Sequence, residues 1–223
     1  MFIGPFGALG DRRHAVVDAD GMAMSARRNH AMLGYRARYL DHDAADSLEV
    51  TLPDGRTCAW DDPGFAAALA RDLEQPTTLV RSPASVHDAA PVHVLTTASL
   101  AAASEWTPGE EIDARRFRAN VIVDLDDPQP FAEAAWPGQT LSLGDNGPVL
   151  GVIAHTERCA VTTFDPDTLE RDGRVLAGLA RDRENLFGVY ARVLRPGWAR
   201  VGDTVAAAAG PAGLTPVAPA LEF

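Results

Sequence analysis

The chain has 223 residues, of which 46% are hydrophobic and 23% charged, so it can bury a substantial core in one or two globular domains. Its formal net charge of -11 argues against nucleic acid as a partner, because a phosphate-binding surface needs a basic stripe. No run approaches the roughly 20 apolar residues of a membrane helix, and the start lacks the features of a signal peptide. We therefore expect neither membrane nor nucleic acid among its partners.

The basic residues indicate which ligands the protein can bind, and the cysteines indicate its redox compartment. All 20 basic residues are arginine, whose rigid fork binds phosphate and carboxylate bidentately, whereas lysine acts as a point charge. Cys58 and Cys159 lie far apart and show neither metal-finger nor disulfide spacing. This use of cysteine predicts a reduced, cytoplasmic protein.

Short strands dominate the first part of the chain. Residues 14–18 and 22–26 form a predicted hairpin around Asp20-Gly21, and the alternating residues 47–52 form a strand before the turn 53–55. A helix is expected to begin at Asp62-Pro63, with the acceptor at the N-cap and proline in the first turn. Its apolar stripe consists of Phe65, Leu69 and Leu73.

The middle of the chain alternates strands with polar connections. Residues 82–91 read as a loop, 92–96 as a strand that contains a structural His93, and 98–105 as a short helix capped by Thr97. Arginines at 115, 116 and 118 open a predicted strand that runs to residue 124. Alternation along that strand would place Arg116 and Arg118 on the same face.

The remaining elements are again mostly strands. We expect strands within 138–164 around the turn 144–147, a helix at 174–183, and a last hairpin formed by 187–194 and 198–205. The fold class is therefore mainly β with a few short helices, organised as barrels. The predicted domains are a β-barrel-like module at 1–76, a second β-barrel at 77–209, and an Ala/Pro-rich tail at 210–223.

One cysteine has the strongest chemical signal. Cys159 follows an apolar, β-branched run, so a strand would deliver its thiol to a turn, and the cation of Arg158 beside it favours the thiolate form. The competing interpretation is a buried cysteine that behaves as a small hydrophobe. A pair with His155 is disfavoured, because four residues of strand separate the two by about 13 Å.

Several motifs occur together in the order typical of a known family. They are residues 117–123, Trp136, 157–168, Phe187-Gly188-Val189-Tyr190-Ala191, and 195–203. This pattern resembles the MOSC family, named for the C-terminal domain of molybdenum-cofactor sulfurase. Residues 10–18 through 26–28 resemble the β-barrel module that precedes MOSC in the mitochondrial amidoxime reducing component and its bacterial relatives, so the resemblance covers nearly the whole chain.

The resemblance implies a molybdenum-pterin cofactor, with Cys159 as the catalytic residue and metal ligand. A soft thiolate suits the sulfur-rich coordination of molybdenum. Family-level pyridoxal phosphate binding is also implied. The residues that match cofactor-binding positions, together with the arginine beside the cysteine, are Arg27, Asp88, Ala89, Ala90, Arg118, Asn120, Arg158 and Tyr190.

Two functions follow from the resemblance, and a third possibility is a degenerate domain with a buried Cys159. The first is a molybdenum-dependent, two-electron reductase of small N-hydroxylated or N-oxygenated substrates. Its electrons would come from a separate flavin or iron-sulfur partner, since two cysteines cannot hold an iron-sulfur cluster. The alternative is a non-enzymatic sulfur carrier or cofactor-binding module that uses Cys159 as a persulfide acceptor.

The start of the chain departs from the family pattern. Relatives begin with a strand that ends in Tyr-Pro-Val-Lys-Ser, whose lysine helps to bind the cofactor, and this chain contains no lysine. Three explanations stay open: a start codon further upstream, a shortened protein, or substitution by Arg12 and Arg13. The first barrel is then expected to lack a strand and to expose a sheet edge.

Overall fold

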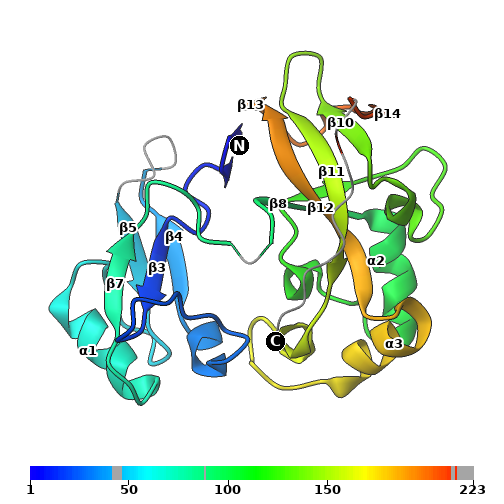
Figure 1. Ribbon diagram of the computed structural model, residues 1–223. Coiled ribbons are helices and arrows are strands. Elements are labelled where there is room, and N and C mark those ends of the chain that lie inside the picture. The colour runs from blue at the N-terminus through cyan, green and yellow to red at the C-terminus, as the bar shows by residue number, and fades with distance from the viewer. Residues whose placement is uncertain (42–46, 88, 212–213, 215–223) are drawn as a thin grey trace. The chain divides into compact units, whose positions relative to one another are not determined.

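The computed structural model describes residues 1–41, 47–87, 89–211 and 214. Two compact units make up the chain: one is Gly10–Val86, and the other joins Met1–Leu9 to the chain from His87 onward (Figure 1). Strands predominate and the helices are short, which confirms the prediction of a mainly β fold. Among the described residues, no helix has the length and apolar character needed to cross a bilayer.

The described residues of the unit 10–86 form two small antiparallel sheets and one α-helix. One sheet pairs β3 (His14–Val17) with β7 (Thr78–Arg81), and the other has the order β4-β5-β6, with a 3-10 turn η1 before it. The remaining bounds are Arg36–Tyr39 for β4, Leu48–Thr51 for β5, Thr57–Ala59 for β6 and His30–Gly34 for η1. The predicted strand at 22–26 is wrong in extent, because only the single bridge Val17–Ala23 forms there.

Helix α1 (Pro63–Asp72) confirms the capping prediction. The Asp62 side chain accepts a hydrogen bond from the Gly64 amide at 2.6 Å, which satisfies a donor that the first turn would otherwise leave free. Phe65 and Leu69 are buried on its inner face. They pack into a core whose buried members also include Val16, Val50, Leu52, Ala68 and Leu73.

The larger unit is built on a curled six-stranded sheet with the order β14-β10-β11-β12-β8-β9 (Figure 1). Its strands are β8 (Val92–Thr96), β9 (Val121–Val123), β10 (Gln139–Leu143), β11 (Val149–Glu157), β12 (Leu186–Arg195) and β14 (Val205–Ala209). Neighbours are antiparallel except β8 and β9, which run parallel. Buried aliphatic residues from these strands form one core, including Val94, Leu141, Leu150, Val152 and Val189.

The predicted hairpin at the end of the chain is wrong in its second arm. Instead of one strand at 198–205, β13 (Gly197–Trp198) pairs with β1 (Phe2–Gly4), and β14 pairs with β10. A turn separates the two strands, where Asp203 accepts a hydrogen bond from the Arg200 amide at 2.8 Å. Strand β1 also pairs with β2 (Gly7–Ala8), so a three-stranded sheet forms in place of the hairpin.

The predicted tail at 210–223 is described only at residues 210, 211 and 214, and the rest of it lies outside the described residues. Gly210 donates its amide hydrogen to the Gly138 carbonyl at 3.1 Å, and Leu214 is buried. These two contacts attach this part of the segment to the larger unit.

Two α-helices and two 3-10 turns cover one face of the large sheet: α2 (Thr97–Ala103), α3 (Gly173–Arg183), η2 (Ser104–Trp106) and η4 (Ala132–Ala135). Thr96, rather than the expected Thr97, caps α2 by accepting a hydrogen bond from the Ser99 amide. The predicted helix at 174–183 is confirmed, and Asp172 caps it. Buried aromatic and aliphatic side chains join the helices to the sheet, including Leu95, Trp106, Phe117, Val175, Leu179 and Phe187.

Gly178 allows α3 to approach Trp106 closely. A Cβ atom added at residue 178 would lie 2.2 Å from the indole ring, so we expect Gly178→Ala to displace that ring and to lower the free energy of unfolding by about 1–3 kcal/mol. Chemical denaturation measures this loss. Gly173→Ala, in the first turn of the same helix and with no atom within 4 Å, is the matched control, and an equal loss there would contradict the packing argument.

Candidate functional site

The arginine-rich segment before β9 is a turn rather than the start of a strand. Residues Ala114–Phe117 form the 3-10 helix η3, and the Asp113 side chain accepts a hydrogen bond from the Arg115 amide at 2.8 Å. Arg118 then adopts a left-handed backbone with φ of 53°, which ends the turn. The prediction that Arg116 and Arg118 share one strand face is therefore wrong, because neither residue belongs to a strand.

Cys159 lies at the junction of a strand and a turn, as expected. Strand β11 ends at Glu157, and the half-buried Cys159 is the N-cap residue of the 3-10 helix η5 (Ala160–Thr163). The amide and the hydroxyl of Thr162 both donate to the Cys159 carbonyl, at 3.1 and 2.9 Å. The backbone at the thiol is thus fixed by two local hydrogen bonds.

Arg158 is a half-buried cation whose guanidinium is partly shielded from solvent. Its Nη2 donates to the Phe117 carbonyl at 2.8 Å, while its buried Nε has no hydrogen-bond partner. Among the described residues no carboxylate forms an ion pair with it. Burial lowers the pKa of Arg158 to about 10, an effect that the nearby Tyr190 and Cys159 oppose and Arg118 reinforces. The four side chains therefore form one electrostatic cluster.

His93 connects this cluster to the sheet. The buried ring lies with Nδ1 3.1 Å from the Phe117 carbonyl and Nε2 3.3 Å from the Phe187 carbonyl, and it meets the Tyr190 ring edge-on at 5.8 Å. The His93 amide donates to the Asn120 side chain at 2.9 Å. Asn120 therefore fixes β8, while β8 and β12 align His93 with Tyr190.

The structure brings together five of the predicted site residues: Arg118, Asn120, Arg158, Cys159 and Tyr190. Arg118 is exposed at the end of its turn. In the loop before β8, Ala90 is buried and Ala89 is exposed, whereas Asp88 lies outside the described residues. Arg27 is exposed in a turn of the 10–86 unit.

The His155 ring contacts the main chain of another segment. Its Nε2 lies 2.9 Å from the Ala134 carbonyl oxygen, within hydrogen-bonding distance. Across the described part of the chain, no group of three or more His, Cys, Asp or Glu side chains could hold a metal ion. A metal at this site would therefore need ligands from a cofactor as well as from the protein.

Two contributors to the cluster were missed from the sequence. The strand pattern around His93 predicts only a structural role for it, and the sequence gives no sign of the Phe117 carbonyl, which faces both His93 and Arg158. Its orientation depends on the left-handed Arg118, and no residue type at that position signals such a conformation, because glycine or asparagine would be the usual choice.

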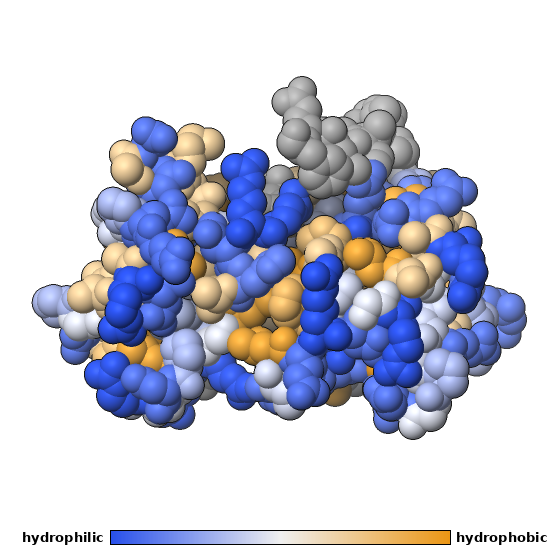
Figure 2. All heavy atoms as spheres, turned by 90° about the horizontal axis from the view of Figure 1, so that it is seen from below, coloured by the Kyte–Doolittle hydropathy of each residue, from blue (hydrophilic) through white to orange (hydrophobic). Residues whose placement is uncertain are grey.

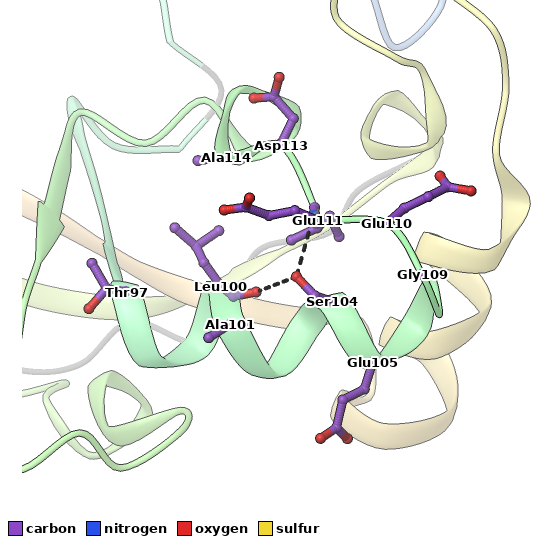
Figure 3. Close-up of a pocket in the computed structure, with 11 residues that line it drawn as sticks. Thr97, Leu100, Ala101, Ser104, Glu105, Gly109, Glu110, Glu111, Asp113 and Ala114 are labelled. Carbon is purple, nitrogen blue, oxygen red and sulfur yellow. Dashed lines mark hydrogen bonds between the residues drawn. The ribbon is translucent and has the colours of Figure 1, made fainter.

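A separate groove lies between α2 and the segment 109–114 (Figure 3). Its floor includes Leu100 and Ala101, and Ser104 links its walls by accepting a hydrogen bond from the Ile112 amide at 3.1 Å. Neither Arg158 nor Cys159 lines it. Its acidic lining residues are Glu105, Glu110, Glu111 and Asp113. Hydrophilic side chains are also frequent on the face of the molecule that Figure 2 shows.

The loop that follows Cys159 is held by a carboxylate. The amides of Thr168 and Asp167 donate to Asp165 Oδ1, each at 2.9 Å, and these bonds lower the pKa of Asp165 below its usual range. A lowered carboxyl pKa in the folded state adds stability above the unfolded-state pKa of about 4, and this stability is lost as the pH falls through the folded-state pKa.

We therefore expect Asp165→Asn to lower the free energy of unfolding at neutral pH and to flatten its decline under acid conditions. Urea denaturation across a pH series measures both effects. Asp20→Asn, at an exposed turn position, is the control. Parallel pH curves for wild type and Asp165→Asn would contradict the proposed anchoring.

The geometry defines a mainly β protein with a single thiol at a strand end beside a buried guanidinium. A family model for the MOSC domain matches residues 81–206, which is more than half of the chain, so the chain belongs to the MOSC domain family. MOSC domains are associated with the molybdenum cofactor.

Solved structures similar to this chain include two MOSC-family proteins. The YuaD protein of Bacillus subtilis is 16% identical with a TM-score of 0.45, and the match covers 64% of this chain and 74% of that chain. YiiM from Geobacillus stearothermophilus is 13% identical with a TM-score of 0.43, covering 92% and 78%. No curated protein matches the chain significantly.

Proposed function

We propose that this MOSC protein binds the molybdenum-pterin cofactor through Cys159 and reduces small N-oxygenated molecules by two electrons. The observation that carries the proposal is the half-buried guanidinium of Arg158, whose buried Nε has no hydrogen-bond partner, beside the half-buried thiol. A partly buried cation without a carboxylate partner carries a desolvation cost, and an anionic ligand would offset that cost.

The residues fit such a cofactor in two respects. Its phosphate is an anion that requires charge-assisted donors, and Arg158 has an unsatisfied Nε while the exposed Arg118 lies close enough to influence it. Its metal favours sulfur, and Cys159 is the one thiol in this cluster. The fit depends on both donor types being present together.

Each residue then has a defined role. Cys159 ligates the metal, Arg158 and Arg118 neutralise negative charge, and Tyr190 lines the site beside His93. The resemblance adds Arg27 and the loop 88–90 as cofactor contacts. When bound, the molybdenum would supply oxygen-atom transfer from a nitrogen–oxygen group, and the protein would supply orientation and electrostatics. Electrons would arrive from a separate flavin or iron-sulfur protein.

The test uses the full chain isolated from a host that makes the cofactor. We expect molybdenum and pterin in near-stoichiometric amounts, and reduction of an aromatic amidoxime with a reduced viologen as the electron donor. Protein without molybdenum would contradict the proposal. Sulfur transferred to Cys159 by a desulfurase, in protein that binds no metal, would instead favour the sulfur-carrier alternative.

A further inference from the structure

Two turns carry the charged and nucleophilic ends of the site, and reciprocal hydrogen bonds tie them together. From the segment that leads into η5, Arg158 donates to the Phe117 carbonyl of η3 at 2.8 Å. From η3, Arg116 Nη1 donates to the Thr163 carbonyl of η5 at 3.2 Å. Each arginine thus reaches from its own segment to the last residue of the other turn.

Arg116 makes a second contact that strengthens its hold on η5. Its Nη2 lies 3.1 Å from Asp165 Oδ2, so one guanidinium bridges a carbonyl and a carboxylate two residues apart. Only 12% of its side chain is exposed. The Thr163 carbonyl also accepts from the Asp172 amide at 2.7 Å, which connects this junction to the start of α3.

The neighbouring Arg115 gives a natural comparison. It also links η3 to the loop after Cys159, through Asp167, and pairs with Asp113 at the start of its own turn. However, 58% of its side chain is exposed and both partners are carboxylates. Ion pairs in solvent contribute little, typically less than about 1 kcal/mol. Arg116 instead satisfies a main-chain carbonyl from a shielded position, where a lost hydrogen bond has a larger structural effect.

We propose that Arg116 is a positioning residue that holds the Cys159 turn against the Arg118 turn and so sets the charge around the thiol. This inference rests on the proposed function only in treating Cys159 and Arg118 as parts of one site. The hydrogen bonds of the Arg116 side chain go to Thr163 and Asp165, and neither Cys159 nor Arg118 is among these partners. It acts through the Thr163 carbonyl at the end of η5 and through Arg118, which directly follows η3.

The experiment compares two alkylating reagents on the full chain in a Cys58→Ala background, where Cys159 is the single thiol. Iodoacetate is anionic and iodoacetamide is neutral, yet the thiolate attacks the iodine-bearing carbon of both and displaces iodide. The ratio of their rates therefore cancels thiol ionisation and reports the positive charge near Cys159. Screening by salt should lower the ratio, as for any interaction between accessible charges.

We expect Arg116→Gln to lower the iodoacetate-to-iodoacetamide ratio about threefold, as the cationic turn moves away from the thiol. Arg115→Gln should leave the ratio within about 1.5-fold of wild type, because its exposed ion pairs hold neither turn firmly. Arg116→Lys should give an intermediate value, since an ammonium lacks the planar fork that reaches both partners. Arg118→Gln calibrates the loss of the exposed cation itself.

An unchanged ratio in Arg116→Gln, together with a lowered ratio in Arg118→Gln, would overturn the inference. If Arg116→Gln fails to fold, Arg116→Lys decides in its place: a reduced ratio supports the inference and a wild-type ratio overturns it. Equal slowing by both reagents would show a merely structural role and would also overturn it. Absence of molybdenum from the wild type would contradict the proposed function while leaving this rate comparison intact.

Discussion

Replacing Cys159 with alanine should remove molybdenum from the protein and lower amidoxime reduction by at least about 100-fold, a loss that even supporting residues around a metal can produce. The physical reason is that no other thiol belongs to the cluster around Arg158. Metal analysis of the purified variant measures the first effect and steady-state kinetics the second.

Cys58→Ala is the matched control for this substitution. Cys58 lies in β6 of the other unit, its Sγ is 3.9 Å from the Val50 carbonyl, and burial raises the pKa of its thiol. This thiol is a packing residue, so the variant should keep its molybdenum and its activity. Equal metal content in Cys159→Ala and wild type would contradict the assignment of the ligand.

Arg158→Met should abolish cofactor binding while leaving the free energy of unfolding unchanged or raised by about 1 kcal/mol. Burial lowers the pKa of Arg158 to about 10, below that of an arginine in the unfolded chain, so its charge opposes folding at every pH below that value. The Phe117 carbonyl, which loses the hydrogen bond from Arg158 in this variant, would still have His93 Nδ1 as a partner at 3.1 Å.

Arg183→Met is the control for this second prediction. The Nε atom of Arg183 is also buried without a partner, and its guanidinium lies 4.2 Å from the centre of the Phe131 ring, outside the cluster around Cys159. That variant should retain molybdenum. Chemical denaturation measures the free energy of unfolding of both variants, and metal analysis measures their molybdenum content. A large loss of stability in Arg158→Met would contradict the prediction and show that the arginine stabilises the fold.

Local rules predicted the elements that local interactions determine. Asp62 caps helix α1 as predicted, and the predicted turns at 53–55 and 144–147 join the strands on either side of them. Alternation of the arginines at 116 and 118 wrongly predicts a strand in the segment before β9. A cap at Asp113 and a left-handed residue 118 produce a 3-10 turn instead.

The site could be predicted only where its residues are neighbours in sequence. Arg158 and Cys159 are adjacent, so the cation beside the thiol was evident from the sequence. The approach of Arg158 to the Phe117 carbonyl, and of His93 to Tyr190, depends on pairing between distant strands. Such contacts are fixed by sheet register, which a single sequence does not specify.

The most direct test of the central claim is molybdenum X-ray absorption on wild type and on Cys159→Ser protein reconstituted with the cofactor. Bond lengths from this method separate sulfur from oxygen ligands. The wild type should show one more sulfur ligand than the serine variant. The same sulfur coordination in both proteins would mean that the thiol of Cys159 does not bind the metal.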